Sequence, residues 1–365
     1  MGPRRFDGKP DDLQTGYAMT MTSSGKPKLR SFVSAQQVAD LAGVSRSAVS
    51  RTFTDGASVS EPTRQKVIAA AEALGYHVNH LARGLIQDQS NIVCLVVTDV
   101  RTPHQSRMID ALTGRLQRAE KVAMVINTSG APESVEKALR QTLEYRADAT
   151  IVLSGKPPAS LIQTCLNNGQ HVITLNRDDP MVGPETIIVG NRAAAREAFL
   201  HLRSAGCQRI ALVASDVGTE SILARQAGFT AAAAEAGVAV QLVRHGPTSY
   251  DSGVDIARML LGPDTRPDGV FCVTDLLACG FMDAARSEFG LAVPDDLSVI
   301  GFDDIEQAGW SSFALTTFSQ PVDQIADCIV NLLNGPPPTG ARREPIEFPA
   351  ELVWRKSVRG VPAKP

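Results

Sequence analysis

The sequence predicts an all-α headpiece with a helix–turn–helix, followed by an α/β core of two doubly wound subdomains. Three observations support this prediction. Residues 34–53 show the capping and apolar spacing of two short helices joined by a tight turn. From residue 91, short β-rich runs alternate with helical stretches, which requires crossover connections and parallel sheets. The length of 365 residues exceeds what one hydrophobic core usually serves.

The first predicted helix begins after Ser34, which is a good N-cap, and Gln37 completes a capping box. We expect Val38 and Leu41 to form the apolar face of this helix. Gly43 can take the left-handed backbone conformation that a tight turn between two helices needs.

The second predicted helix is capped by Ser45, and Val49 and Phe53 lie four residues apart on one face. The opposite face carries hydrogen-bonding side chains of the kind that read bases in a major groove, namely Arg46, Ser47, Ser50 and Arg51. A solvated polar surface is the alternative interpretation of this face.

A third helix is predicted from Ser60 to about Leu74, with Gly75 as its stop. Its inward-facing residues should be Val67, Ile68, Ala71 and Leu74. Asn79 then caps a short segment that reaches Leu85, just before the change of architecture.

The run from Ser34 to Leu85 resembles the headpiece and hinge of the lactose/galactose repressor (LacI/GalR) family of bacterial transcription regulators. The resemblance rests on VADLAGVSRSAVSR, VSEPTRQKVIAAAEALGY and NHLARGL, whose order and spacing match the family without a gap. With two C-terminal motifs, ARQAGF and VIGFDD, it covers nearly the whole chain after residue 30. It implies a repressor that binds pseudo-palindromic double-stranded operator DNA as a homodimer and responds to a small-molecule effector.

The expected DNA contacts combine the helix–turn–helix with the hinge. In the family, a hinge leucine enters the minor groove at the operator centre, and Leu85 occupies the matching position; such a wedge kinks the duplex. The candidate residues are Ser34, Ser45, Arg46, Ser47, Ser50, Arg51, Asn79, Arg83 and Leu85.

Two β/α series follow the hinge. In the first, strands are expected at 92–97, 122–127, 150–153 and 171–175, with helices near 105–119, 134–145 and 161–168. In the second, helices near 191–205, 223–236, 252–261 and 275–289 alternate with strands at 210–214, 240–243, 269–273 and 298–302. The resemblance implies a periplasmic-binding-protein-like core that closes on a small molecule, with chain crossings near 189, 318 and 349.

These elements give a predicted domain organisation. It comprises a disordered extension at 1–30, the headpiece at 31–77, the hinge helix and linker at 78–90 and the effector-binding and dimerisation core at 91–365. Within the core, the N-terminal subdomain spans about 91–188 and 319–349, and the C-terminal subdomain about 189–318 and 350–360.

Ligands of open α/β sheets bind beyond the carboxyl ends of the strands. Polar residues at those ends are therefore candidate effector contacts, among them His104, Asn176, Arg177, Thr274, Asp275 and Asp303. Comparison with the family described above adds Arg225 and Thr248 to these candidates. For the strand-end residues a helix-capping role is the alternative, and for Arg225 the alternative is an arginine on a helix surface. The resemblance assigns effector binding to Asp303 in VIGFDD and to Arg225 in ARQAGF. We expect these two side chains to grip one polar ligand from opposite walls, with Arg177 and Asp275 assisting.

This chain departs from the family at positions that would shape the pocket. Thr102-Pro103-His104-Gln105 replaces the usual Asn-Pro and aromatic residues. Thr274 replaces an asparagine, and Thr248 replaces a common aromatic residue. Because part of the aromatic face is lost, the effector is left open between a sugar and a more polar metabolite. Whether it is an inducer or a corepressor is also open.

Charge and cysteine usage agree with this class of protein. Residues 1–86 hold eleven Lys/Arg against seven Asp/Glu, so the headpiece side is net +4 and the remainder net −7. The six cysteines are scattered in apolar surroundings without a CxxC pair, as in a reduced cytoplasmic protein. No cofactor, metal site, signal peptide or membrane span is expected, and we expect a cytoplasmic, nucleoid-associated protein.

Two other classes remain as alternatives. A transport solute-binding protein shares the core fold, but the headpiece and the missing signal peptide argue against it. An enzyme on the same scaffold finds little support, because the sequence contains no P-loop, nucleophile elbow, zinc-protease motif or dinucleotide fingerprint. The final residues hold no heptad repeat, which argues against a tetramer built on a C-terminal coiled coil.

Overall fold

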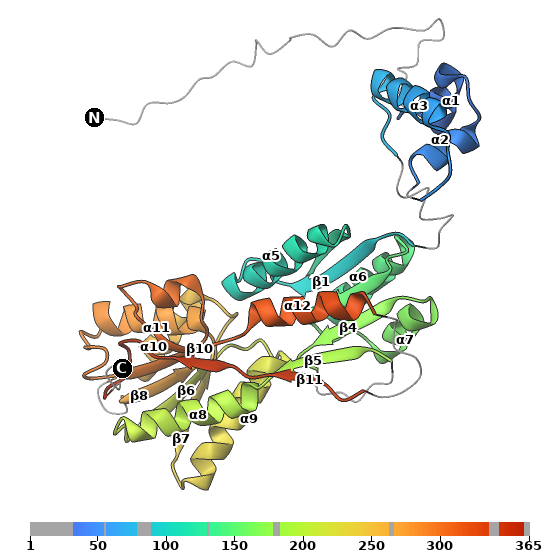
Figure 1. The fold of residues 1–365 in the computed structure, drawn as a ribbon. Helices are drawn as coiled ribbons and strands as arrows, with labels where there is room; N and C mark the ends of the chain where they lie inside the picture. Colours follow the sequence, from blue (N-terminus) through green and yellow to red (C-terminus); the bar gives the residue numbers. More distant parts are fainter. Residues whose placement is uncertain are drawn as a thin grey trace, which may run out of the picture. The chain divides into compact units, whose positions relative to one another are not determined.

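The computed structural model describes residues 32–54, 56–78, 89–129, 131–177, 183–262, 266–335 and 343–360. The chain divides into two compact units, residues 1–83 and 84–365 (Figure 1). The first unit holds three helices in its described part, α1 (Ala35–Ala42), α2 (Arg46–Thr52) and α3 (Glu61–Leu74). The expected residues Asn79, Arg83 and Leu85 lie outside the described part of the chain.

The headpiece helices begin and end where the sequence predicts. Ser34 and Gln37 form the capping box, and Gly43 has a φ of 66° at the end of α1. The small core of this unit consists of Val38, Ala39, Val49, Val67, Ala70 and Ala71, with partly buried apolar neighbours around it.

Two residues predicted to face this core do not. Leu41 is 56% exposed and Ile68 is 40% exposed. On α1 the buried stripe runs through positions 35, 38, 39 and 42, and on α3 through 67, 70, 71 and 74. Both stripes follow the 3.6-residue helical period, and positions 41 and 68 fall beside them.

The second unit contains two parallel sheets, as predicted. The N-terminal sheet has the order β11-β5-β4-β3-β1-β2. Its strands are β1 (Ile92–Thr98), β2 (Val122–Thr128), β3 (Ala149–Val152), β4 (His171–Leu175), β5 (Glu185–Val189) and β11 (Ile346–Phe348). Apolar side chains of α5 (Pro103–Arg118) and α12 (Val322–Leu333) share one core with this sheet. A second core holds α6 (Pro132–Glu144) and α7 (Ala159–Asn167).

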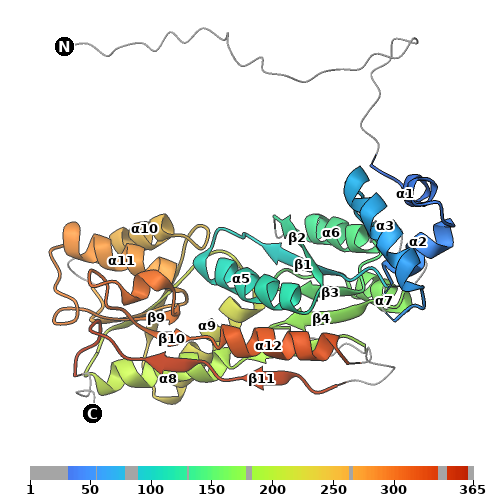
Figure 2. The same ribbon diagram turned by 45° about the horizontal axis from the view of Figure 1, so that its top comes forward.

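The C-terminal sheet repeats this arrangement, with the order β12-β10-β9-β8-β6-β7. Its strands are β6 (Ile210–Ala214), β7 (Val240–Arg244), β8 (Gly269–Cys272), β9 (Ser298–Asp303), β10 (Thr316–Ser319) and β12 (Glu351–Val353). Only β12 runs antiparallel to its neighbour among these described strands. Its helices are α8 (Asn191–Ser204), α9 (Glu220–Glu235), α10 (Tyr250–Leu260) and α11 (Asp275–Ser287), and Figure 2 shows α10 and α11 side by side.

The chain passes between the two sheets after β5, after β10 and after β11. In each sheet the strand order reverses beside the first strand of the series, β1 or β6. Ligands of doubly wound sheets bind at the carboxyl ends of the strands around such a reversal. A binding site is therefore expected among the residues that follow β1, β3, β6, β8 and β9.

Candidate functional site

The exposed face of α2 carries the side chains predicted to meet bases. Its buried residues are Ala48, Val49 and Thr52, while Arg46, Ser47, Ser50 and Arg51 are all exposed. Arg64 of α3 donates a hydrogen bond to the Thr52 carbonyl at 3.1 Å and so fixes α2 from behind. The resulting surface is basic and rich in hydrogen-bonding groups, which suits a polyanion with readable base edges.

The two predicted serines at helix starts serve as caps. The Ser34 hydroxyl donates to Gln37 Oε1 at 3.0 Å and accepts from the Gln37 amide at 3.3 Å. Ser45 Oγ accepts from the Ala48 amide at 3.2 Å and pairs with Ser47 Oγ at 2.9 Å. Both serines are exposed, so they fix the helix ends at the surface where DNA contact is expected.

In the core, Arg225 and Asp303 form a buried ion pair at 3.2 Å. Arg225 Nη1 also donates to the Val273 carbonyl at 2.7 Å, and its Nε donates to Asn191 Oδ1 at 2.8 Å. Its guanidinium lies 3.6 Å from the centroid of the Phe302 ring, within cation–π range. The ion pair corrects one expectation: both side chains belong to the C-terminal subdomain and hold each other, so they do not face a ligand from opposite walls.

Asp303 has an unusual backbone conformation. Its φ is 121°, a region that non-glycine residues rarely adopt. Its Oδ1 accepts from both Arg225 and Gln320 Nε2, the latter at 2.7 Å. Such strain is retained where the surroundings over-determine a side chain's position, and it is common at binding sites. Gln320, which follows β10, was not predicted from the sequence.

Asp275 does not fit the predicted role as an effector contact. It is fully buried, and its two carboxylate oxygens accept from the Ile305 amide at 3.0 Å and from Thr317 Oγ1 at 2.6 Å. A Cβ at Gly301 would lie 2.1 Å from Asp275 Oδ1, so glycine is required for this carboxylate to fit. Asp275 therefore holds β9 and β10 together beneath the site. Burial, with the nearby Asp303 charge, raises its pKa to about 7.

Within the described part of the chain, two of the predicted effector contacts have a buried polar atom without a hydrogen-bond partner. These atoms are Thr274 Oγ1 at the start of α11 and His104 Nδ1 at the start of α5. Burial lowers the pKa of His104, the Asp303 charge opposes this, and the Arg225 charge adds to it. Unsatisfied buried polar atoms are costly, so both atoms are candidates for ligand contact.

The remaining predicted residues follow strands of the two different sheets. Thr248 Oγ1 pairs with Ser215 Oγ at 2.8 Å in the C-terminal subdomain. Asn176 has a φ of 52°. Its Oδ1 accepts hydrogen bonds from the Val189 amide at 2.9 Å and from Asn191 Nδ2 at 3.3 Å. Arg177 donates to the Pro157 carbonyl at 3.2 Å in the N-terminal subdomain.

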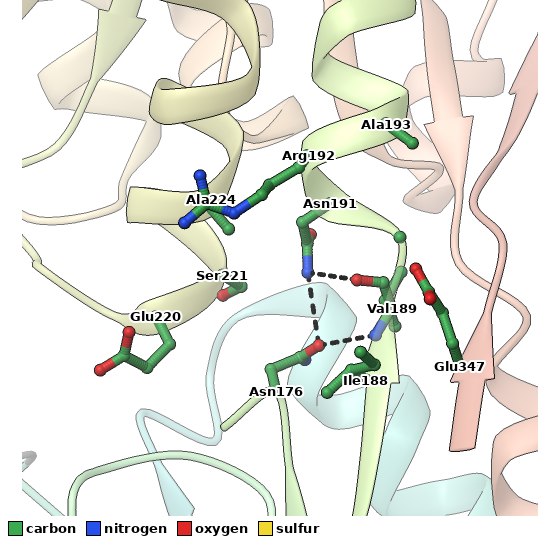
Figure 3. A pocket seen from close by; sticks show the side chains of 11 residues that line it. Asn176, Ile188, Val189, Asn191, Arg192, Ala193, Glu220, Ser221, Ala224 and Glu347 are labelled. Atoms are coloured by element: carbon green, nitrogen blue, oxygen red, sulfur yellow. Dashed lines mark hydrogen bonds between the residues drawn. The ribbon is translucent and has the colours of Figure 1, made fainter. Parts of the chain in front are cut away.

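A pocket of about 190 Å³ lies where the chain first crosses between the subdomains (Figure 3). Its lining comes from the end of β4, the crossing, the start of α9 and β11: Asn176, Ile188, Val189, Gly190, Asn191, Arg192, Ala193, Glu220, Ser221, Ala224 and Glu347. Neither Arg225 nor Asp303 lines it, but Asn191 joins the pocket to Arg225 by a hydrogen bond. Figure 3 shows the Asn191 side chain pointing to Asn176, with Ser221 and Ala224 of α9 to one side of them.

Asn191 and Glu220 were not predicted, although one signal was available. Asn191 follows the end of β5 by two residues, so the strand-end rule would have included it. Glu220 at the start of α9 pairs with Lys156, which follows β3 in the other subdomain. Of the ion pairs within the described residues, this one joins the two subdomains.

The described residues lack the features of two other kinds of site. No group of three or more His, Cys, Asp or Glu side chains within them has the arrangement of a metal site. In the same residues, no helix combines the length and apolar character needed to cross a bilayer.

Sequence comparison gives two matching family models. Residues 35–79 match the model described as "Bacterial regulatory proteins, lacI family", and residues 199–358 match a periplasmic binding protein-like domain. The chain is 30% identical to the HTH-type transcriptional repressor PurR of Histophilus somni (strain 129Pt), over 89% of this chain and 98% of that protein. The chain belongs to the lacI family of bacterial regulatory proteins.

Other relatives agree with this membership. The HTH-type transcriptional regulator DegA of Bacillus subtilis (strain 168) is 29% identical over 88% of this chain and 96% of its own length. The crystal structure of the lac repressor dimer bound to operator and the anti-inducer ONPF superposes with a TM-score of 0.80 and 26% identity, covering 90% of this chain and all of that one. This lacI-family protein is therefore a DNA-binding transcription regulator whose operator affinity is set by a small-molecule effector.

Proposed function

We propose that this lacI-family regulator is a homodimeric repressor that reads each operator half-site with the exposed face of α2. The observation that carries the proposal is the division of α2 into a buried side and an exposed side that bears two arginines and two serines. One headpiece reads one half-site, so a two-fold dimer suits a pseudo-palindromic operator. The similarity to a lac repressor dimer bound to operator supports this assembly. Because its target is chromosomal DNA, we place the protein in the cytoplasm, at the nucleoid.

Arg51 tests the proposed reading face. An arginine–guanine pair discriminates between bases by roughly 1–3 kcal/mol. We expect Arg51→Ala to lose preference at one operator position, while a Lys66→Ala control on α3 weakens binding to all sequences alike. Selection of DNA from a random pool identifies the operator, and titration of single-base variants measures the preference. An Arg51→Ala protein that kept the full wild-type preference would contradict the assignment.

We further propose that the effector binds at the carboxyl ends of the strands, between the two subdomains. In this proposal, Arg225, Asp303 and Thr274 form the C-terminal wall, and His104 at the start of α5 contributes from the N-terminal subdomain. A sugar or a more polar metabolite would supply the hydrogen bonds that His104 and Thr274 lack. The ligand is held without chemical conversion, and recovery of unchanged ligand by chromatography tests this point.

Asp303→Asn tests the effector site while keeping the shape of the side chain. Coupling between effector and operator is typically about 1–3 kcal/mol, or roughly 5- to 150-fold in operator affinity. We expect the variant to bind operator nearly as wild type does and to lose most of this response. Asp295→Asn, an exposed substitution shortly before β9, is the matched control. Operator titrations with and without a metabolite identified by thermal-shift screening measure the response. A variant that still responded fully would place the effector elsewhere.

A further inference from the structure

One carboxylate holds the first residues of the core. Asp148 Oδ1 accepts from the Ser90 amide at 2.7 Å and from the Ser90 hydroxyl at 2.8 Å. Its Oδ2 accepts from the Asn91 amide at 2.8 Å. Asn91 has a φ of 56°, so the chain bends sharply here before it enters β1. These three charge-assisted hydrogen bonds to Asp148, which we call the clamp, therefore set the direction in which the chain enters the sheet.

The C-terminal subdomain contains the same arrangement. Asp268 accepts from the Gln208 amide at 2.9 Å and from the Arg209 amide at 2.8 Å, just before β6. The backbone contacts match as well. The Asp148 carbonyl accepts from the His171 amide at 2.9 Å, and the Asp268 carbonyl accepts from the Ser298 amide at 3.0 Å. The two aspartates thus occupy equivalent positions in the two β/α series.

The chain segments that precede these two turns, at residues 90–91 and 208–209, differ from each other. Gln208 follows α8, and further contacts brace that turn, because Arg359 Nη2 donates to the Asp268 carbonyl at 3.2 Å. Ser90 instead ends the predicted linker 78–90, which connects the core to the headpiece. Within the described residues, no side chain other than that of Asp148 accepts a hydrogen bond from the Ser90 and Asn91 amides.

We infer that Asp148 is the anchor that fixes the DNA-side linker to the N-terminal subdomain, and that it acts as a positioning residue for operator binding. The inference rests on the proposed function. Any rotation of the N-terminal subdomain reaches the linker through this clamped turn. When these hydrogen bonds are broken, Ser90 and Asn91 lose their fixed conformation, and fixing them again on operator binding costs conformational entropy.

Asp148→Asn breaks the clamp with the least change of shape. One acceptor oxygen becomes an NH2 group that opposes the Asn91 or the Ser90 donor, so at least one bond is lost. Asp268→Asn makes the same chemical change at the equivalent turn, where no linker begins. The pair therefore separates loss of a structural hydrogen bond from loss of the anchor. Ser90→Ala removes only the hydroxyl bond and serves as a milder second variant.

The experiment titrates wild-type protein and the three variants with the operator duplex selected from the random pool, and with a random-sequence duplex of equal length. We expect Asp148→Asn to bind operator about tenfold more weakly, since freeing even one linker residue costs on that order, while random-duplex binding stays within about twofold. Ser90→Ala should show an intermediate loss. Asp268→Asn should leave both affinities within about twofold of wild type, although melting curves of the two Asn variants should fall similarly.

The outcomes separate two failures. If Asp148→Asn and Asp268→Asn changed operator affinity equally, or if Asp148→Asn weakened operator and random duplex by the same factor, the anchor role would be overturned while the proposed function stood. A wild-type protein that did not distinguish the selected duplex from the random one would overturn the proposed function, and this inference with it.

Discussion

Asp275→Asn should make the core more stable at neutral and alkaline pH. In the native protein this carboxylate is fully buried and accepts hydrogen bonds from the Ile305 amide and the Thr317 hydroxyl. An asparagine can satisfy the same two partners, because its oxygen accepts from Ile305 and its NH2 group donates to the Thr317 hydroxyl. The substitution therefore removes a buried charge and leaves the packing in place.

The pKa of Asp275 gives the size and sign of the effect. Burial and the Asp303 charge raise this pKa from 3.8 to about 7 in the folded protein. Between those values the folded state binds more protons than the unfolded state, so stability falls as pH rises through the window. The total is about 4 kcal/mol, of which about 2–3 kcal/mol is lost between pH 5 and pH 8.

Urea unfolding of wild type and variant at pH 5, 6, 7 and 8 measures this effect. The stability of Asp275→Asn relative to wild type should grow by about 2–3 kcal/mol across the series. Asp295→Asn, which removes an exposed carboxylate from the same subdomain, is the control for net charge. Parallel stability curves for wild type and Asp275→Asn would refute the reasoning, since they would mean that burial does not penalise this charge.

Two further predictions concern contacts within the core, one an ion pair between the subdomains and the other the packing of two helices. Lys156→Glu should weaken effector binding by about two- to fivefold, because exposed ion pairs contribute about 0.2–1 kcal/mol, and adding Glu220→Lys should restore it in a ligand titration. A double variant as weak as the single one would show that the pair does not stabilise closure. Gly280→Ala should destabilise the core by about 1–3 kcal/mol or more, because its Cβ would lie 1.9 Å from the Tyr250 carbonyl on α10. Urea unfolding at pH 7 measures this, and an unchanged midpoint would contradict it.

The headpiece shows how far local pattern reaches. The Ser34–Gln37 capping box and the left-handed Gly43 are confirmed, because such caps depend on residues within one turn of each other. The prediction that Leu41 and Ile68 face the core is wrong, because large apolar side chains alone do not show which side of a helix is buried. The buried stripes use alanines at neighbouring positions, since three short helices in close contact favour small side chains. Choosing between two such stripes requires knowledge of where the partner helix lies.

The core shows a different limit. The α/β alternation predicted two doubly wound subdomains correctly, and the strand-end rule selected residues at the carboxyl ends of their strands. The same rule gave Asp275 and Asp303 equal weight, because both follow buried strands. Their difference arises from tertiary packing: Gly301 lets the Asp275 carboxylate lie between β9 and β10, while Asp303 turns towards Arg225. The contacts assigned to DNA and effector remain predictions.

The buried ion pair changes what an effector must supply. Arg225 already has Asp303, Asn191 and the Val273 carbonyl as partners, so a ligand need not neutralise a bare charge. Of the predicted contacts within the described residues, Thr274 Oγ1 and His104 Nδ1 are buried without a hydrogen-bond partner, and they belong to different subdomains. A ligand shifts an equilibrium only through its differential affinity for the two states. A group that bonded only to the C-terminal wall would bind both arrangements equally, so sensitivity to closure must come from contacts that reach His104 as well.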